Sequence, residues 1–218
     1  MTEAADKADQ RIRKYYLTER GKFIDFIARF VAVESALDIG CAGGRLGSEL
    51  VGTGVAKACD GIEPFPEAAA LAKAQLRRVW SGTLESVSDE VPWSSYDMVV
   101  MADVLEHLVD PWQALKFLRE RTSLNCRLAL SVPNVRHYKV SFPLLFMGKF
   151  RYADQGIMDR THLHFFTRGS LAETLHECGW RIRAIDSSMK DHYRRAFIPT
   201  RWIEPFVTRQ YYLIAEKQ

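Results

Sequence analysis

The sequence predicts an α/β protein built on a doubly wound sheet, and three features of the chain lead to this prediction. Short apolar runs alternate with segments of helical spacing, which is the rhythm of a parallel sheet with helices on both faces. A glycine-rich turn at residues 40–47 follows the first apolar run. The polar residues with a chemical use follow the ends of expected strands, where such sheets bind their ligands.

Composition limits the class of protein. The 218 residues suit one domain over residues 1–218, and 47% hydrophobic with 26% charged residues is ordinary for a globular chain. A net charge of +3 gives no basis for a nucleic-acid partner. The polar first ten residues and the absence of a long apolar run predict no signal peptide and no membrane span. Four scattered cysteines without a Cys-x-x-Cys pair predict reduced thiols and a cytoplasmic location.

Residues 1–34 are expected to form N-terminal helices that lead into the first strand, because apolar residues recur there at helical spacing. Arg20 lies in this region. Its guanidinium can pair with a ligand carboxylate in a fork geometry, or it can be a solvated surface arginine.

The first strand and its loop are the most informative stretch, with Asp38 in the strand and Gly40 and Gly44 in the turn. Glycines let the backbone turn sharply and let a ligand lie against it. The acid precedes the glycines and no Gly-Lys-Ser/Thr follows, so a Walker-type phosphate loop is excluded. A short helix is expected to follow and to end near residue 54. The alternative to a ligand-binding loop is an ordinary turn between strand and helix.

A second strand over residues 57–62 is expected to end at Glu63, followed by a helix over 66–77. A carboxylate at this position can accept both ribose hydroxyl hydrogens of a nucleotide, and the alternative is a solvated strand-end acid. A third strand and its loop are expected at residues 80–85. Its residues Thr83, Leu84 and Glu85 are candidates for contact with an adenine ring.

The fourth strand, residues 96–102, leads directly into Asp103, Glu106 and His107. At spacings i, i+3 and i+4 these side chains share one face if a helix starts there. With His162 from a later loop they make a candidate ligand set for a divalent metal. The structural alternatives are a capping Asp103, a backbone-bound Glu106 and a core His107. A helix from residue 111 to about 121 and a fifth strand over 125–132 follow.

The pattern breaks over residues 134–166, an apolar and aromatic insertion that we expect to pack on the sheet and to form a lid over the substrate side of the site. Thr167, or alternatively Ser170, is expected to cap the next helix, which Gly179 ends near Cys178. Strands over 180–186 and 210–215 complete the sheet. The basic, aromatic connection at 190–202 favours a solvated loop over an anionic-substrate patch.

Five segments together resemble one family. They are Leu-Asp-Ile-Gly-Cys at 37–41, Gly-Ile-Glu-Pro at 61–64, Asp-Val-Leu-Glu-His-Leu-Val-Asp-Pro at 103–111, Ser-Val-Pro-Asn-Val-Arg at 131–136 and Ile-Met-Asp-Arg-Thr-His-Leu-His-Phe-Phe-Thr at 157–167. The chain resembles bacterial class I methyltransferases that use S-adenosylmethionine (SAM), related to ubiquinone-biosynthesis O-methyltransferases and to small-molecule and glycan methyltransferases. Ala42 stands where that family usually has a glycine, and its methyl group is expected to fit.

The resemblance implies a Rossmann-like class I methyltransferase sheet with SAM as cofactor. The cofactor contacts that we predict are Arg20, Asp38, Gly40, Gly44, Glu63, Leu84, Met101 and Ala102. Asp103, Glu106, His107 and His162 match the metal positions of the ubiquinone enzymes, although Asp103 stands where those enzymes usually have a glutamate.

The predicted function is transfer of a methyl group from SAM to a hydroxyl of a small molecule or sugar. His107 and His162 are expected to activate the acceptor, as a general base or through a metal, and the shorter Asp103 favours the metal-free base. Two alternatives remain open. An RNA 2′-O-methyltransferase would use the same residues, and a SAM-binding protein without catalysis would act through partners.

Overall fold

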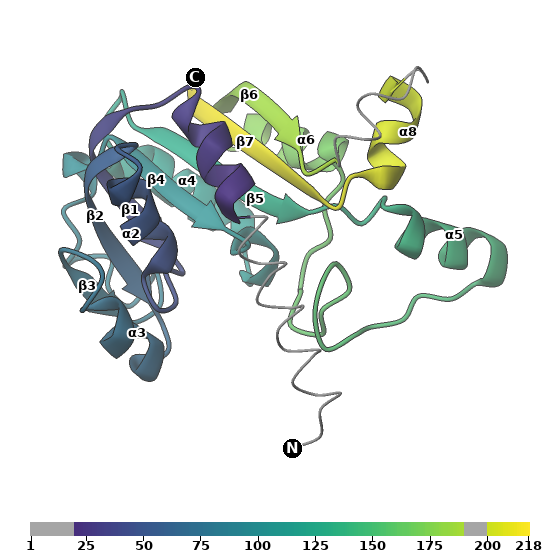
Figure 1. The fold of residues 1–218 in the computed structure, drawn as a ribbon, viewed down its shortest axis with the longest axis horizontal. Coiled ribbons are helices and arrows are strands. Elements are labelled where there is room, and N and C mark those ends of the chain that lie inside the picture. Colours follow the sequence, from purple (N-terminus) through teal and green to yellow (C-terminus); the bar gives the residue numbers. More distant parts are fainter. Residues whose placement is uncertain (1–19, 190–199) are drawn as a thin grey trace.

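The computed structural model describes residues 20–189 and 200–218, and one seven-stranded sheet organises them (Figure 1). The strand order is β3-β2-β1-β4-β5-β7-β6. Pairs among β1 to β5 are parallel, whereas β7 is antiparallel to both β5 and β6. The doubly wound α/β prediction is therefore confirmed, with the correction that the sheet is mixed. The end of β6 and the start of β7 lie beside each other, so β7 runs antiparallel to its neighbours.

The elements agree closely with those expected from the apolar rhythm. A helix over residues 20–28 precedes the first strand. The strands are β1 (Val33–Ile39), β2 (Ala56–Glu63), β3 (Val79–Ser81), β4 (Met98–Ala102), β5 (Arg127–Pro133), β6 (Trp180–Ser187) and β7 (Gln210–Lys217). The helices are α2 (Arg45–Gly52), α3 (Pro66–Ala72), α4 (Pro111–Arg121), α5 (Tyr138–Met147), α6 (Arg168–Glu177) and α8 (Thr200–Val207), with 3-10 turns η1 (Trp93–Ser95) and η2 (Leu105–His107).

Apolar side chains fill both faces of the sheet. Alternate residues of β5 show this directly, because Leu128 and Leu130 belong to one core cluster and Ala129 to the other. Helices α4 and α6 cover the first face, for example through Leu115. The helix over 20–28 and α2 cover the second face. Two buried faces explain why the central strands read as nearly continuous apolar runs.

Three local expectations change in the structure. Helix α3 ends at Ala72, several residues earlier than expected, and β3 contains three residues. The segment after Asp103, considered above as a possible helix start, forms the short turn η2. The insertion contains a regular helix, α5. The expected cap of α6 is confirmed, because Thr167 and Ser170 bond each other's backbone N–H in a capping box.

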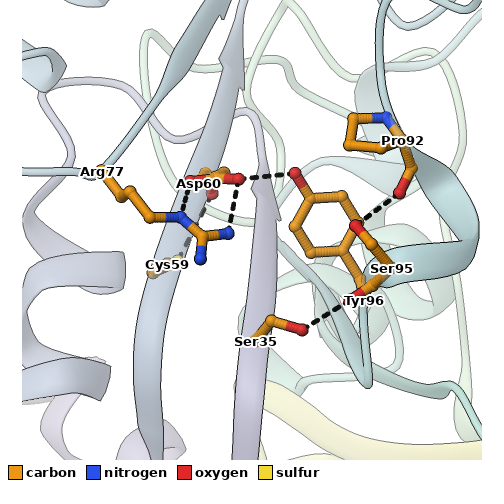
Figure 2. A network of polar contacts seen from close by, with 7 residues as sticks. All are labelled: Ser35, Cys59, Asp60, Arg77, Pro92, Ser95 and Tyr96. Carbon is orange, nitrogen blue, oxygen red and sulfur yellow. Dashed lines mark hydrogen bonds and ion pairs between the residues drawn. The ribbon is translucent and has the colours of Figure 1, made fainter.

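A buried polar network holds the half of the sheet that carries β2 (Figure 2). The Asp60 carboxylate accepts two hydrogen bonds of 2.8 Å from Arg77 and one of 2.6 Å from the Tyr96 hydroxyl. Burial opposes ionisation of Asp60, but these donors outweigh it and hold the pKa of its carboxyl below the usual range. The network therefore ties the segments before β3 and β4 to the strand that ends in Glu63.

Two regions named in the sequence analysis lie wholly or partly outside the described residues. They are residues 1–19 of the expected N-terminal helices and residues 190–199 of the basic connection. Within the described ranges, no helix has both the length and the apolar character needed to cross a membrane.

Candidate functional site

A cavity of about 100 Å³ opens where β4, β5 and β7 meet, at the carboxyl ends of the parallel strands. Six residues predicted from sequence line it: Arg20, Ala102, Asp103, Glu106, His107 and His162. The other lining residues are Phe23, Ser131, Pro133, Gly156, Ile157, Asp159, Arg209, Gln210 and Tyr212. The cavity is thus lined by residues from the N-terminal helix, from the ends of β4 and β5, from the insertion and from the start of β7.

The glycine loop follows β1, which pairs with β4, and the last residue of β4 lines the cavity. Gly40 has a φ of +71° and its N–H donates to the Ile62 carbonyl at 2.8 Å. A Cβ on Gly40 would lie 2.7 Å from Val104, and one on Gly44, with φ of +80°, would lie 3.0 Å from Ala72. Both positions therefore require glycine, for backbone conformation and for space.

Glu63 and Ala42 join the loop to the end of β2. The buried Glu63 carboxylate accepts the Ala42 N–H at 2.8 Å and the Phe65 N–H at 3.0 Å, one on each oxygen. A carboxylate has about four acceptor positions, so each oxygen can accept a further hydrogen bond. Ala42 is exposed and holds a φ of +48°, which its methyl group disfavours.

Replacing Ala42 with glycine is expected to raise the free energy of unfolding by about 1 kcal/mol, since glycine adopts this conformation without strain. Chemical denaturation measures the change. The control is Gly52→Ala, because a Cβ on Gly52 would meet no atom of the described residues within 4 Å and its φ is not positive. A destabilised Ala42→Gly variant would contradict the account of backbone strain.

Asp38 is buried within β1, and one of its carboxylate oxygens has no hydrogen-bond partner among the described residues. Burial raises the pKa of its carboxyl to about 7, while Arg20 acts in the opposite direction. The side chains of Leu84 and Met101 pack in the core, whereas Thr83 and Glu85 are exposed. The cofactor contacts predicted for Asp38, Leu84 and Met101 remain predictions.

Two histidines and one glutamate converge on the cavity. Ligand atoms of Glu106, His107 and His162 all lie within 4.8 Å of one another, and the two imidazole rings are 4.7 Å apart between centroids. Nδ1 of His107 lies 3.2 Å from the Thr161 carbonyl and Nδ1 of His162 lies 3.1 Å from the Ile157 carbonyl. Carbonyl oxygens only accept, so both Nδ1 atoms carry hydrogen and Nε2 is the nitrogen of each ring that could offer a lone pair.

Glu106 completes this acceptor-rich cluster. Its side chain is 1% exposed, and neither carboxylate oxygen has a hydrogen-bond partner among the described residues. Burial, with the nearby charge of Asp103, raises the pKa of Glu106 well above its usual value. Its backbone carbonyl accepts the N–H groups of Leu163 and His164, which fastens the His162 loop to η2.

The cluster has the chemistry of a divalent-cation site. A carboxylate and two imidazole nitrogens are ligands that borderline divalent metals prefer. Ligating histidines usually donate their other ring N–H to a carbonyl or carboxylate, as both do here. A buried carboxylate without donors needs either a proton or a cation. These three residues therefore fit a metal.

Asp103 lies outside this group of three ligands, and the helix on which the shared face depended does not start at Asp103. Its φ of +56° turns the chain away from helical geometry just before η2. The Asp103 carboxylate instead accepts hydrogen bonds from the Ser131 hydroxyl, at 3.2 Å, and from the Gln210 side-chain amide. Hydrogen bonds from residues of β5 and β7 thus decide where the Asp103 side chain lies, rather than its spacing from Glu106 and His107.

Sequence reasoning missed several residues that line the cavity, above all Arg209 and Gln210. Gln210 begins β7 and Arg209 directly precedes it, and this antiparallel strand starts at the edge where the parallel strands end. Asp159 is a second example: it accepts hydrogen bonds from the Thr161 N–H and hydroxyl, which shapes the loop before His162. The sequence signal that could have identified Asp159 is its place just before Thr161 and the predicted site residue His162.

Comparisons with known proteins agree with this geometry. Residues 10–185 match a family described as a methyltransferase domain. The mitochondrial ubiquinone biosynthesis O-methyltransferase of Schizosaccharomyces pombe is 34% identical over 99 residues, which are 44% of this chain. The match spans only 36% of the length of that yeast enzyme.

Solved structures share the fold at low identity. A SAM-dependent methyltransferase from Archaeoglobus fulgidus superposes with a TM-score of 0.65 at 17% identity, over 92% of this chain and 93% of the other. Magnesium protoporphyrin IX methyltransferase from Synechocystis, solved with bound S-adenosylhomocysteine (SAH), gives 0.67 at 14% identity, over 97% and 87%.

Proposed function

The chain belongs to the class I SAM-dependent methyltransferases, and from this premise we propose that it transfers the methyl group of SAM to a hydroxyl of a small molecule or sugar. The observation that carries the proposal is the Glu106, His107 and His162 cluster, which shares one cavity with Arg20 and Ala102. Similarity to an O-methyltransferase supports a hydroxyl as the acceptor atom.

The proposed SAM site lies along the carboxyl ends of β1, β2 and β4. Glu63 is proposed to accept the ribose hydroxyls, and Arg20 to pair with the methionine carboxylate. Gly40 and Gly44 would let the cofactor approach the backbone closely. Asp38, Leu84, Met101 and Ala102 complete the proposed set.

We propose that the cluster removes or stabilises the proton of the acceptor hydroxyl. As a base, a neutral histidine would take the proton at Nε2, since Nδ1 already donates to a carbonyl. Burial and the neighbouring His107 lower the pKa of His162, which favours this neutral form. A divalent metal held by Glu106, His107 and His162 would lower the pKa of the hydroxyl. The unpartnered Glu106 supports the metal, although the sequence alone favoured the metal-free base.

Methyl transfer from isotopically labelled SAM to hydroxylated small molecules and sugars tests the proposal. SAH binding by calorimetry with labelled product from such an acceptor would support it. SAH binding with product only on RNA, lost at high salt, would favour the RNA alternative. SAH binding without any product would favour a binding protein, and absence of SAH binding would contradict the cofactor assignment.

The lid expected over residues 134–166 remains a prediction, and we propose that its stretch 153–162 closes the acceptor side. Gly156, Ile157 and His162 from this stretch line the cavity. Trypsin is expected to cut the free protein at the exposed Arg160, and SAM with acceptor should slow that cut several-fold because closure orders the loop. Cleavage after Lys149, outside the stretch, is the internal control. Equal cleavage at Arg160 in both states would contradict the lid.

A further inference from the structure

We infer that α5 and the exposed tryptophan of α8 form a docking surface for an anionic membrane, whatever the methyl acceptor is. Five side chains of α5 are exposed apolar groups: Phe142, Leu144, Leu145, Phe146 and Met147. Trp202 on α8 is 80% exposed. These six residues, called the apolar tip below, stand out because exposed apolar side chains on folded proteins are usually scattered singly.

The apolar tip projects from the body of the protein. Helix α5 extends away from the sheet, with α8 close to its base (Figure 1). The Phe142 and Phe206 rings, one from each helix, are 6.0 Å apart between centroids. The two helices therefore pack together at one end of the molecule.

The distribution of apolar residues around α5 indicates a fluid partner. Residues 143–147 are five consecutive apolar residues, and at 100° per residue they surround the helix completely. A protein groove covers one face of a helix and favours a one-sided apolar stripe. Lipid can cover all sides of a short helical end. Trp202 lies on α8, which contacts the base of α5, and tryptophan is the residue type that prefers the boundary between lipid and water.

Charge around the tip matches an anionic lipid surface. Residues 136–153 contain Arg136, Lys139, Lys149 and Arg151 and no aspartate or glutamate. Lys139, Lys149 and Arg151 are exposed. Arg136 lies over the Phe206 ring at 4.8 Å, at the base of α5. Basic groups around an inserted apolar end are attracted by the negative surface potential of anionic lipids.

The length of α5 sets how deep the tip can enter. Ten helical residues rise about 15 Å, roughly half of a hydrocarbon core of about 30 Å. The tip can therefore enter one leaflet and cannot span the bilayer.

The docking surface adjoins the proposed acceptor side of the site. The Phe150 ring is 5.6 Å from the Phe165 ring, and Phe165 is 6.2 Å from the His162 ring. A membrane-bound molecule would thus hold its cavity near the lipid surface.

Flotation of the full chain with vesicles tests the inference. The protein should float with vesicles of mixed phosphatidylcholine and phosphatidylglycerol and remain unbound with phosphatidylcholine alone. Leu145→Glu with Phe146→Glu should lower binding roughly a hundredfold, because both side chains lose apolar burial. Lys149→Glu with Arg151→Glu should lower it about tenfold or more. All four substituted side chains are exposed, so both variants are expected to fold, and thermal unfolding checks this.

Leu124→Glu is the matched control, because Leu124 is 86% exposed on the loop between α4 and β5 and should leave flotation unchanged. Trp202 supplies a second readout, since Trp80, Trp93 and Trp180 are buried and Trp112 is half-buried against the core. Anionic vesicles should shift tryptophan emission to the blue, and Trp202→Phe should remove the shift.

Absence of flotation at low salt would overturn the inference, as would equal loss in the tip variant and the Leu124→Glu control. Equal binding to neutral and anionic vesicles would overturn the charge argument. A dimer in solution that Leu145→Glu converts to a monomer, without flotation of the wild type, would assign the surface to a second copy of the chain instead.

Discussion

Replacing His107 with alanine is expected to lower the rate of methyl transfer by about a hundredfold or more, with nearly unchanged affinity for SAH. The substitution removes one Nε2 lone pair from the cluster and leaves Glu63 and the glycine loop untouched. His162→Ala should have a similar effect. His176→Ala is the matched control, because His176 is exposed on α6 and bonds Gln218. Wild-type rates in both cluster variants would show that the pair is structural.

Glu106→Gln separates the two proposed forms of acceptor activation. If the cluster holds a divalent metal, calorimetric titration should detect binding to the wild type and a loss of about tenfold or more in the variant, which lacks the anionic ligand. A chelator should then lower turnover, and added metal should restore it. If the histidines act as a metal-free base, the wild type should bind no metal and the chelator should leave turnover unchanged.

Replacing Glu63 with glutamine is expected to weaken SAH binding by about a hundredfold, since an amide accepts at one oxygen where the carboxylate accepts at two. Calorimetry measures the affinity. Thermal unfolding must be followed as well, because Glu63 also accepts the Ala42 and Phe65 N–H groups. Glu67→Gln, an exposed acid in the first turn of α3, is the control. Unchanged affinity in Glu63→Gln would contradict its proposed role at the ribose.

The amino-acid sequence by itself determined the features that depend on neighbours along the chain. The apolar rhythm predicted the strands and helices, and the residues at 167 and 179 predicted the limits of α6, where a hydroxyl caps one end and a glycine with φ of +77° ends the other. The loop at Gly40 and Gly44 was readable for the same reason, because its backbone conformation selects glycine locally.

Only the tertiary structure decided how distant segments share the cavity. The reversed direction of β7 brings Gln210 to Asp103, and that contact holds Asp103 away from the face that helical spacing predicts. The Glu106 carbonyl holds the loop that carries His162, so the two histidine rings lie side by side. Burial of the Glu106 carboxylate without a donor follows from the same packing. Such arrangements depend on contacts between residues far apart in the chain, which local spacing does not encode.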